Sequence, residues 1–140
     1  MARFAGHAVG ERAVRMAEEL LGEELSDRMR RVRYHRNEVG VDPFGFDPET
    51  GRYALAVAAL LHRLYFRSEV RGVEALPEGR LLIISNHSGQ VPLDGLMIGT
   101  AMMLDADPPR FPRSMVEKWT AQLPFISSFF PRVGQVVGSP

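Results

Sequence analysis

The stretch RLLIISNHSGQVPLDGLMIGTAMML, residues 80–104, sets the fold class of this sequence. Its first six residues form a continuous apolar run between a glycine and a polar cluster, which predicts a buried strand over 80–85. Glycine and proline bends follow, and the apolar residues after them predict a helix over 93–104 whose packed faces are filled by methionines. The stretch therefore predicts a strand that leads through a tight connection into a helix.

Strands and helices continue to alternate after this stretch. A second strand is predicted within 108–116, where Pro112 indicates a sheet edge or a bulge. A helical region broken before Pro124 follows, and RVGQVVG, residues 132–138, predicts a third short strand. This alternation indicates an α/β fold with a short, mostly parallel sheet and right-handed crossover helices.

Two helices are predicted upstream of the α/β region. Apolar residues recur at spacings of three and four over 8–36, which predicts one long amphipathic helix. Its apolar stripe consists of Val14, Ala17, Leu21, Leu25, Met29 and Val32. Residues 37–51, rich in Gly, Pro, Asp and Asn, predict a loop. Residues 52–70 predict a second helix that is apolar on most sides, and this helix is either buried or lies in a membrane interface.

This order of elements divides the sequence into an N-terminal helical region, 1–70, and an α/β region, 71–140. Three short strands and two preceding helices make a thin α/β layer, and nothing covers the sheet after residue 138. We therefore expect residues 71–140 to be the N-terminal, truncated part of a larger α/β domain.

Five arginines crowd the last part of the first predicted helix: Arg28, Arg30, Arg31, Arg33 and Arg36. Acidic residues dominate its first part, so this order of charges suits the helix dipole. The alternative is a basic patch that binds lipid phosphates. The sequence leaves both interpretations open.

The composition excludes several classes of function. The 17 basic and 17 acidic residues balance, so no global charge favours nucleic acid as a partner. The absence of cysteine excludes disulfides, thiolate metal sites and a cysteine nucleophile. No apolar run is long enough for a secretory signal or a membrane span, so we expect a cytoplasmic protein.

The residues that carry candidate chemistry are His87 and Asp94. In an open α/β sheet, ligands bind beyond the carboxyl ends of the strands, which is where His87 is expected. A carboxylate folded back onto the imidazole would fix its tautomer and leave Nε2 as a general base. The alternative is that Asp94 only caps the helix and His87 is a satisfied polar residue at a strand end.

Two other chemistries are disfavoured. Ser88 is an unfavourable nucleophile for His87, because adjacent residues of an extended chain point to opposite faces. A metal site is not expected, because the other histidines, His7, His35 and His62, lie far away in the sequence.

LLIISNHSGQVPLDG, residues 81–95, resembles the first motif of the glycerolipid acyltransferase family, the lysophosphatidate-type phospholipid/glycerol acyltransferases. The family hallmark is an Asn-His followed by an aspartate at the end of a strand. The resemblance implies that His87 is the general base for the acceptor hydroxyl and that Asp94 orients it. PRSMVEKWTAQLPFISSFFPRVGQVVG, residues 112–138, resembles the second region of the family, and VDPFGFDPE, residues 41–49, resembles the leader of a bacterial subgroup.

The sequence departs from the family pattern at three places. The family commonly has four residues between His and Asp, whereas six intervene here. Its glycerol-phosphate-binding arginine is expected just after the GQVV strand, and Arg132, just before that strand, is the candidate substitute. The third family motif, Phe-Pro-Glu-Gly, does not occur; LPEG at 76–79 lies upstream of His87 and predicts a turn.

The resemblance implies an O-acyltransferase that moves a fatty acyl group from acyl-CoA or acyl-ACP to a hydroxyl of a lysophospholipid or related glycerolipid. It implies no cofactor beyond this acyl thioester co-substrate, and no metal. The implied catalytic residues are His87 and Asp94. The candidate substrate-binding residues are Asn86, Ser88, Gly89, Gln90 and Arg132.

The implied partners are the thioester donor, the glycerolipid acceptor and a membrane surface, with no nucleic acid. The expected location is peripheral, on the inner face of the cell membrane. Two alternatives remain from the same residues. One is a truncated, non-catalytic lipid- or membrane-binding module of the same fold, and the other is a hydrolase that uses the same dyad on water.

Overall fold

The computed structural model describes residues 2–22, 25–34, 36–39, 42–87 and 91–138. The α-helices are α1 (Ala2–Leu21), α2 (Leu25–Arg31), α3 (Pro48–Leu60), α4 (Leu93–Leu104) and α5 (Ile126–Arg132). Shorter helical turns are η1 (Leu61–Tyr65, a π-helix), η2 (Val73–Ala75) and η3 (Lys118–Gln122), both 3₁₀. The strands are β1 (Met115–Val116) and β2 (Val136–Val137).

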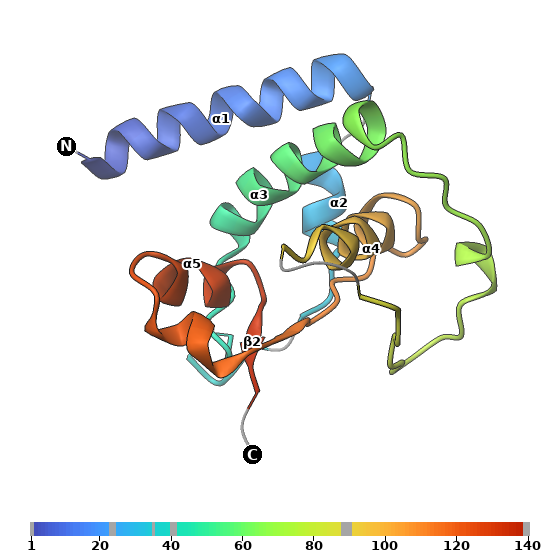
Figure 1. The fold of residues 1–140 in the computed structure, drawn as a ribbon. Helices are drawn as coiled ribbons and strands as arrows, with labels where there is room; N and C mark the ends of the chain where they lie inside the picture. The colour runs from blue at the N-terminus through green and yellow to red at the C-terminus, as the bar shows by residue number, and fades with distance from the viewer. Residues whose placement is uncertain (1, 23–24, 35, 40–41, 88–90, 139–140) are drawn as a thin grey trace.

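Helix α3 lies at the centre of the molecule and contacts α1, α2, α4 and α5 (Figure 1). The buried apolar core forms where the first four helices meet. It consists of Val14, Ala17, Leu25, Met29, Val32, Phe46, Leu55, Ala56, Ala59, Met103 and Leu104. The apolar stripe predicted over 8–36 is therefore confirmed as the face that packs into the core, with Leu21 partly buried beside it.

The prediction of one continuous helix over 8–36 is wrong, because α1 ends at Leu21 and α2 begins at Leu25. Gly22 terminates α1 with φ +63°, a left-handed conformation that glycine adopts without steric cost, and its N–H donates to the Glu18 carbonyl at 2.9 Å. The interruption lets both halves of the stripe face α3.

Helix α3 begins at Pro48, four residues before the predicted start at residue 52. The Asp47 carboxylate accepts the Glu49 N–H, and proline is well suited to the first helical turn because its missing N–H would be unsatisfied there. The helix then widens into the π-turn Leu61–Tyr65, so the predicted helix over 52–70 ends early. The predicted loop over 37–51 is correspondingly shorter.

Strands β1 and β2 pair in parallel, with Met115 opposite Val136 and Val116 opposite Val137. The parallel pairing and the helices η3 and α5 between the two strands confirm a small α/β unit with a helical connection. Both strands are shorter than the predicted 108–116 and 132–138. Prolines upstream of β1 lack the N–H that a longer ladder would need, and Arg132 still belongs to α5.

The predicted buried strand over 80–85 is wrong. These residues adopt no regular secondary structure, and Leu82 and Ile84 are 83% and 85% exposed. A continuous apolar run is buried as a strand only where a sheet neighbour pairs with it and layers cover both faces. Within the described residues, β1 and β2 pair only with each other, so this run has no such neighbour.

The helix predicted over 93–104 is confirmed as α4, and its Met102 and Met103 are buried as expected. The helical region broken before Pro124 is also confirmed, as η3 and α5. In the part of the chain that the structure describes, no helix has the length and apolar character needed to cross a membrane.

Candidate functional site

Asp94 lies in the first turn of α4 and not at its N-cap, which is Pro92. Its carboxylate accepts the Gly95 N–H at 2.7 Å. A negative charge in the first turn is favoured by the helix dipole, which also holds the carboxylate in place. The helix start therefore fixes the position of this side chain without using it as a cap.

The structure brings His87 and Asp94 together although six residues separate them. His87 Nδ1 lies 2.9 Å from both Oδ1 and Oδ2 of Asp94. An ionised carboxylate only accepts hydrogen bonds, so a neutral His87 carries its proton on Nδ1 and keeps the lone pair on Nε2. Among the described residues, Nε2 of His87 makes no hydrogen bond.

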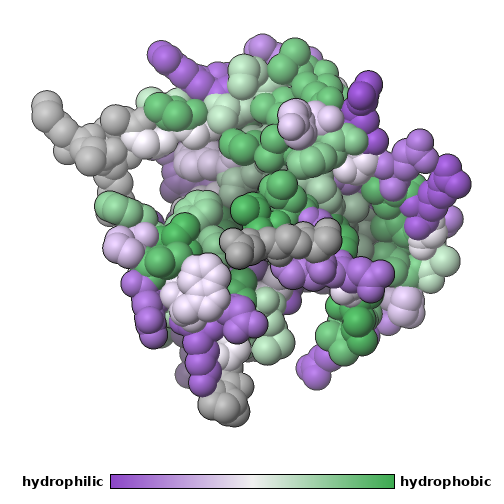
Figure 2. All heavy atoms as spheres, viewed as in Figure 1, coloured by the Kyte–Doolittle hydropathy of each residue, from purple (hydrophilic) through white to green (hydrophobic). Residues whose placement is uncertain are grey.

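The pair is open to solvent. The His87 side chain is 55% exposed and the Asp94 side chain 28% exposed. Apolar side chains close to the pair in the sequence are exposed as well, among them Leu82, Ile84, Val91, Leu93 and Leu96. Figure 2 shows apolar residues gathered over α3 and α4 on the face seen in this view. The imidazole thus lies where a molecule with an apolar part could reach it.

The other predicted site residues are less informative. Asn86 precedes His87 and is exposed, whereas Ser88, Gly89 and Gln90 lie outside the described residues. Arg132 ends α5, is exposed, and its carbonyl accepts the Asp47 N–H at 3.1 Å. Among the contacts of the described residues, none joins Arg132 to the His87–Asp94 pair. The described residues contain no group of three or more His, Cys, Asp or Glu side chains placed to hold a metal ion.

A second histidine–aspartate pair lies at the junction of η1 and α4, and the sequence patterns gave no indication of it. His62 Nε2 is 3.5 Å from Asp105 Oδ2, and Arg63 donates to Asp105 Oδ1 at 2.7 Å. The His62 side chain is 1% exposed and that of Asp105 18%. This pair is enclosed by protein, so no substrate reaches it without a rearrangement.

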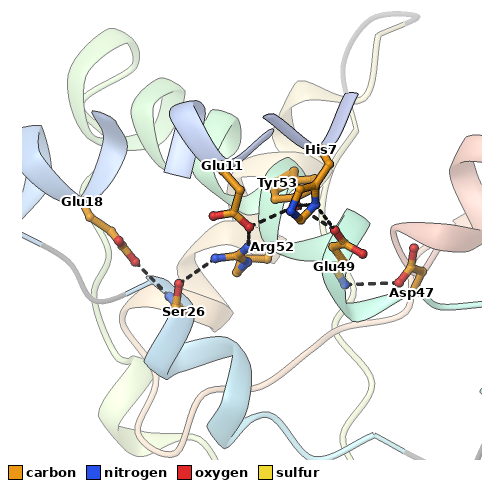
Figure 3. Close-up of polar contacts among 8 residues, drawn as sticks. All are labelled: His7, Glu11, Glu18, Ser26, Asp47, Glu49, Arg52 and Tyr53. Atoms are coloured by element: carbon orange, nitrogen blue, oxygen red, sulfur yellow. Dashed lines mark hydrogen bonds and ion pairs between the residues drawn. The ribbon is translucent and has the colours of Figure 1, made fainter. Parts of the chain in front are cut away.

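A polar cluster between α1 and the start of α3 was also missed (Figure 3). Tyr53 donates to Glu49 Oε1 at 2.8 Å, His7 Nδ1 lies 2.5 Å from the same oxygen, and Arg52 pairs with Glu11. Burial, followed by the hydrogen bond to Glu49, raises the pKa of Tyr53 to about 12, so its hydroxyl remains a donor. Because the partners lie far apart in the sequence, no local pattern reveals this cluster.

The carboxylates of this cluster are held in their charged forms. The hydrogen bond from Arg52 lowers the pKa of Glu11, with burial opposing it. Hydrogen bonds from Tyr53 and then His7 lower the pKa of Glu49. Gly10 permits the close packing, because a Cβ at that position would lie 2.6 Å from the Tyr53 ring.

The chain is similar to mycobacterial proteins whose names state no function. A protein from Mycobacterium leprae (strain TN), named as uncharacterized, is 33% identical over 99 residues, which cover 69% of this chain and 27% of that protein. Uncharacterized proteins from Mycobacterium bovis and Mycobacterium tuberculosis are 33% identical over 105 residues, 71% of this chain and 28% of theirs. The chain thus spans less than a third of the length of these relatives. No protein-family model matches the chain, and no solved structure does.

Proposed function

We propose that this chain is part of an O-acyltransferase that transfers a fatty acyl group from an acyl thioester to a hydroxyl of a lysophospholipid or related glycerolipid. The observation that carries the proposal is the contact of His87 Nδ1 with the Asp94 carboxylate at 2.9 Å on an exposed surface. The resemblance of residues 81–95 to the first motif of the glycerolipid acyltransferases supports the same assignment.

The roles follow from the geometry of the pair. Nε2 of His87 accepts the proton of the acceptor hydroxyl while its oxygen attacks the thioester carbonyl carbon. Asp94 keeps the proton of the neutral ring on Nδ1 and stabilises the imidazolium that forms. When the tetrahedral intermediate collapses, the carbon–sulfur bond breaks and the imidazolium returns the proton to the departing thiolate. The products are an ester and a free thiol, and no covalent enzyme intermediate is needed.

The test is a thiol-release assay on the full-length protein with a long-chain acyl-CoA and a lysophosphatidate acceptor in mixed micelles. Acyl transfer predicts thiol release that requires the acceptor and equals the amount of new ester. Thiol release with free fatty acid and without any acceptor would instead identify a hydrolase. Absence of thiol release with acyl-CoA and with acyl-ACP, over a panel of lyso-acceptors, would overturn the proposal.

A second candidate, a non-catalytic lipid-binding module, is favoured by the exposed apolar residues that flank the dyad in the sequence. Leu82 and Ile84, upstream of His87, are more than 80% exposed, and Val91, between His87 and Asp94, is 65% exposed. This candidate predicts binding to lipid vesicles that is weakened by Leu82→Ser with Ile84→Ser and unaffected by His87→Ala. The acyltransferase proposal predicts a loss of turnover in His87→Ala, so the two variants separate the candidates.

A further inference from the structure

A groove of about 1060 Å³ lies between α1, α2, the segment after α2 and the start of α3. All of its lining residues belong to residues 7–52, so it shares none with the His87–Asp94 pair. Met29 and Val32, which are buried, contribute apolar surface to it. The groove therefore combines an apolar part with the charged residues described next.

The five arginines that crowd the sequence around α2 divide into two groups. Arg28 donates to the carbonyls of Met103 at 3.2 Å and Ala106 at 3.3 Å, and Arg31 pairs with Asp107. Arg28 ties α2 to the end of α4, whereas the Arg31–Asp107 pair is exposed, and neither arginine lines the groove. The other three, Arg30, Arg33 and Arg36, line the groove.

The three groove arginines keep donors available for a ligand. Arg30 pairs with Asp27 at 3.2 Å, but both side chains are exposed and such a pair contributes little. The guanidinium of Arg36 lies 4.8 Å from the centre of the Tyr34 ring and donates to its hydroxyl. Arg33 makes no ion pair or hydrogen bond with any described residue. A planar guanidinium presents five donors, so these contacts leave most of them unused.

The acidic residues of the groove already have partners. Glu11 is paired with Arg52, and Glu49 is bonded to Tyr53 and His7 (Figure 3). The excess charge in the groove is therefore positive and lies at Arg30, Arg33 and Arg36. This excess is local, because the 17 basic and 17 acidic residues of the whole chain balance.

The groove is also built before any ligand arrives. The His7–Glu49–Tyr53 contacts join α1 to α3, and Arg52 donates to Ser26 Oγ at 3.2 Å, which joins α3 to α2. A site whose walls are fixed in advance loses less entropy on binding than one that must be ordered by its ligand.

We infer that this groove binds the phosphate group of an organic phosphate, with Arg33 and Arg36 as its main donors and Arg30 in support. Guanidinium groups match the geometry of phosphate oxygens with paired, charge-assisted hydrogen bonds. The apolar surface of Met29 and Val32 suits the organic part of such a ligand. The inference does not depend on acyl transfer. The phosphate can belong to a soluble ester or to a lipid headgroup, which share this chemistry.

The first experiment titrates the full chain with inorganic pyrophosphate by calorimetry. We expect binding that weakens as salt is raised and that falls at least about tenfold in the double variant Arg33→Gln, Arg36→Gln, equivalent to about 1.4 kcal/mol. The matched control is Arg12→Gln, Arg15→Gln, which removes the same charge at the same spacing from exposed positions outside the groove. The control is expected to change affinity by less than about twofold.

The second experiment identifies the source of the phosphate. Flotation with phosphatidylcholine vesicles, with and without phosphatidic acid, measures binding to a lipid headgroup. It uses the same three proteins: the unmodified chain and the two double variants. If the vesicles capture the protein only with phosphatidic acid and intact groove arginines, and pyrophosphate does not bind, the ligand is a lipid headgroup. If pyrophosphate binds and the vesicles do not capture the protein, the ligand is a soluble phosphate. Equal weakening by the groove and control variants, or no binding in either experiment, would overturn the inference. Thermal unfolding of each variant confirms that the exposed substitutions leave the fold intact.

Discussion

The described part of the molecule contains two histidine–aspartate pairs, and their surroundings differ. His87 and Asp94 lie 2.9 Å apart on an exposed surface, whereas His62 and Asp105 lie 3.5 Å apart in a protein-enclosed junction. Arg63 also bonds Asp105, so the carboxylate of the enclosed pair is shared with a permanent cation. The two contacts differ in kind, because His87 Nδ1 is hydrogen-bonded to Asp94, whereas His62 Nε2 and Asp105 Oδ2 lie at ion-pair distance and share no hydrogen bond. Of these two histidines, only His87 is exposed to solvent.

This difference shows why a histidine near a carboxylate does not by itself define a catalytic site. A general base must reach the proton of its substrate within hydrogen-bonding distance, which requires access as well as a fixed tautomer. The enclosed pair joins η1 to the end of α4 and serves packing. We expect loss of the exposed His87 side chain to cost the fold little, because surface substitutions usually change stability by less than about 0.5 kcal/mol.

The largest effect is expected for His87→Ala in the full-length protein. Loss of the base should lower acyl transfer by about 10³-fold or more, because general-base catalysis typically contributes two to four orders of magnitude. Stability should change by less than about 0.5 kcal/mol, since the side chain is exposed. Turnover and urea unfolding are measured on the same preparation. If His87→Ala lowers the free energy of unfolding but keeps its turnover per folded molecule, His87 has a structural role and not a catalytic one.

The sequence patterns identified the exposed pair and missed the enclosed one for a physical reason. His87 and Asp94 are separated by one short connection, and the helix that begins at Leu93 is a strong local signal, so their meeting could be anticipated. His62 and Asp105 meet only through the packing of η1 against α4. Such long-range contacts leave no periodicity in the sequence.

The distinction between local signals and long-range contacts also bears on the errors in the predicted fold. The apolar stripe of the first helices was predicted correctly because it depends on local periodicity. The break at Gly22 was missed because the apolar spacing continues across it, although a glycine that ends a helix is itself a local signal. The run 80–85 has the composition of a buried strand, yet burial of a strand also requires a sheet neighbour. Composition could not reveal that β1 and β2 pair only with each other in the described part of the chain.

The next largest effect is expected for Asp94→Asn. The amide can donate to Nδ1 and favour the wrong tautomer, so acyl transfer should fall by about 10²-fold or more. The amide keeps the size of the side chain, and the Gly95 N–H still has an oxygen acceptor, so α4 should remain intact. A pH–rate profile, measured together with the helix content, separates the two roles of Asp94. If Asp94 orients His87, the variant loses turnover at every pH while α4 remains folded. Normal turnover with reduced stability would make Asp94 a structural residue of the helix start.

A smaller effect, and one on stability instead of turnover, is expected for His62→Ala. Removal of a side chain that is 1% exposed leaves a cavity and removes a neighbour of Asp105, which should cost about 2–4 kcal/mol of unfolding free energy. Turnover per folded molecule should stay at the level of the unmodified protein. The comparison between the pairs fails if His62→Ala abolishes transfer while the midpoint of urea unfolding is unchanged.

The smallest effect concerns a third aspartate, Asp42, which is buried and extends the comparison to an acid with no histidine partner among the described residues. Asp42 pairs with Arg113 and accepts the N–H groups of Phe44 and Phe46, and its side chain is 1% exposed. Burial opposes its ionisation, but the hydrogen bonds from Arg113 and the two backbone groups outweigh burial and lower the pKa of Asp42 below its ordinary value of 3.8.

A lowered pKa in the folded state means that ionised Asp42 stabilises the fold at pH values above its ordinary pKa, and that this contribution is lost as the pH falls towards the folded value. Asp42→Asn keeps an oxygen acceptor for the two backbone groups, but it removes the charge and replaces the acceptor of Arg113 with an amide NH₂, so it should cost about 1–2 kcal/mol at neutral pH. The difference between the two proteins should shrink steadily below about pH 3.8 as the natural carboxyl becomes protonated. Urea unfolding of both proteins over that range measures the difference. If the gap stayed constant with pH, packing and not the charge of Asp42 would account for its contribution, because a neutral amide and a protonated acid differ little in charge.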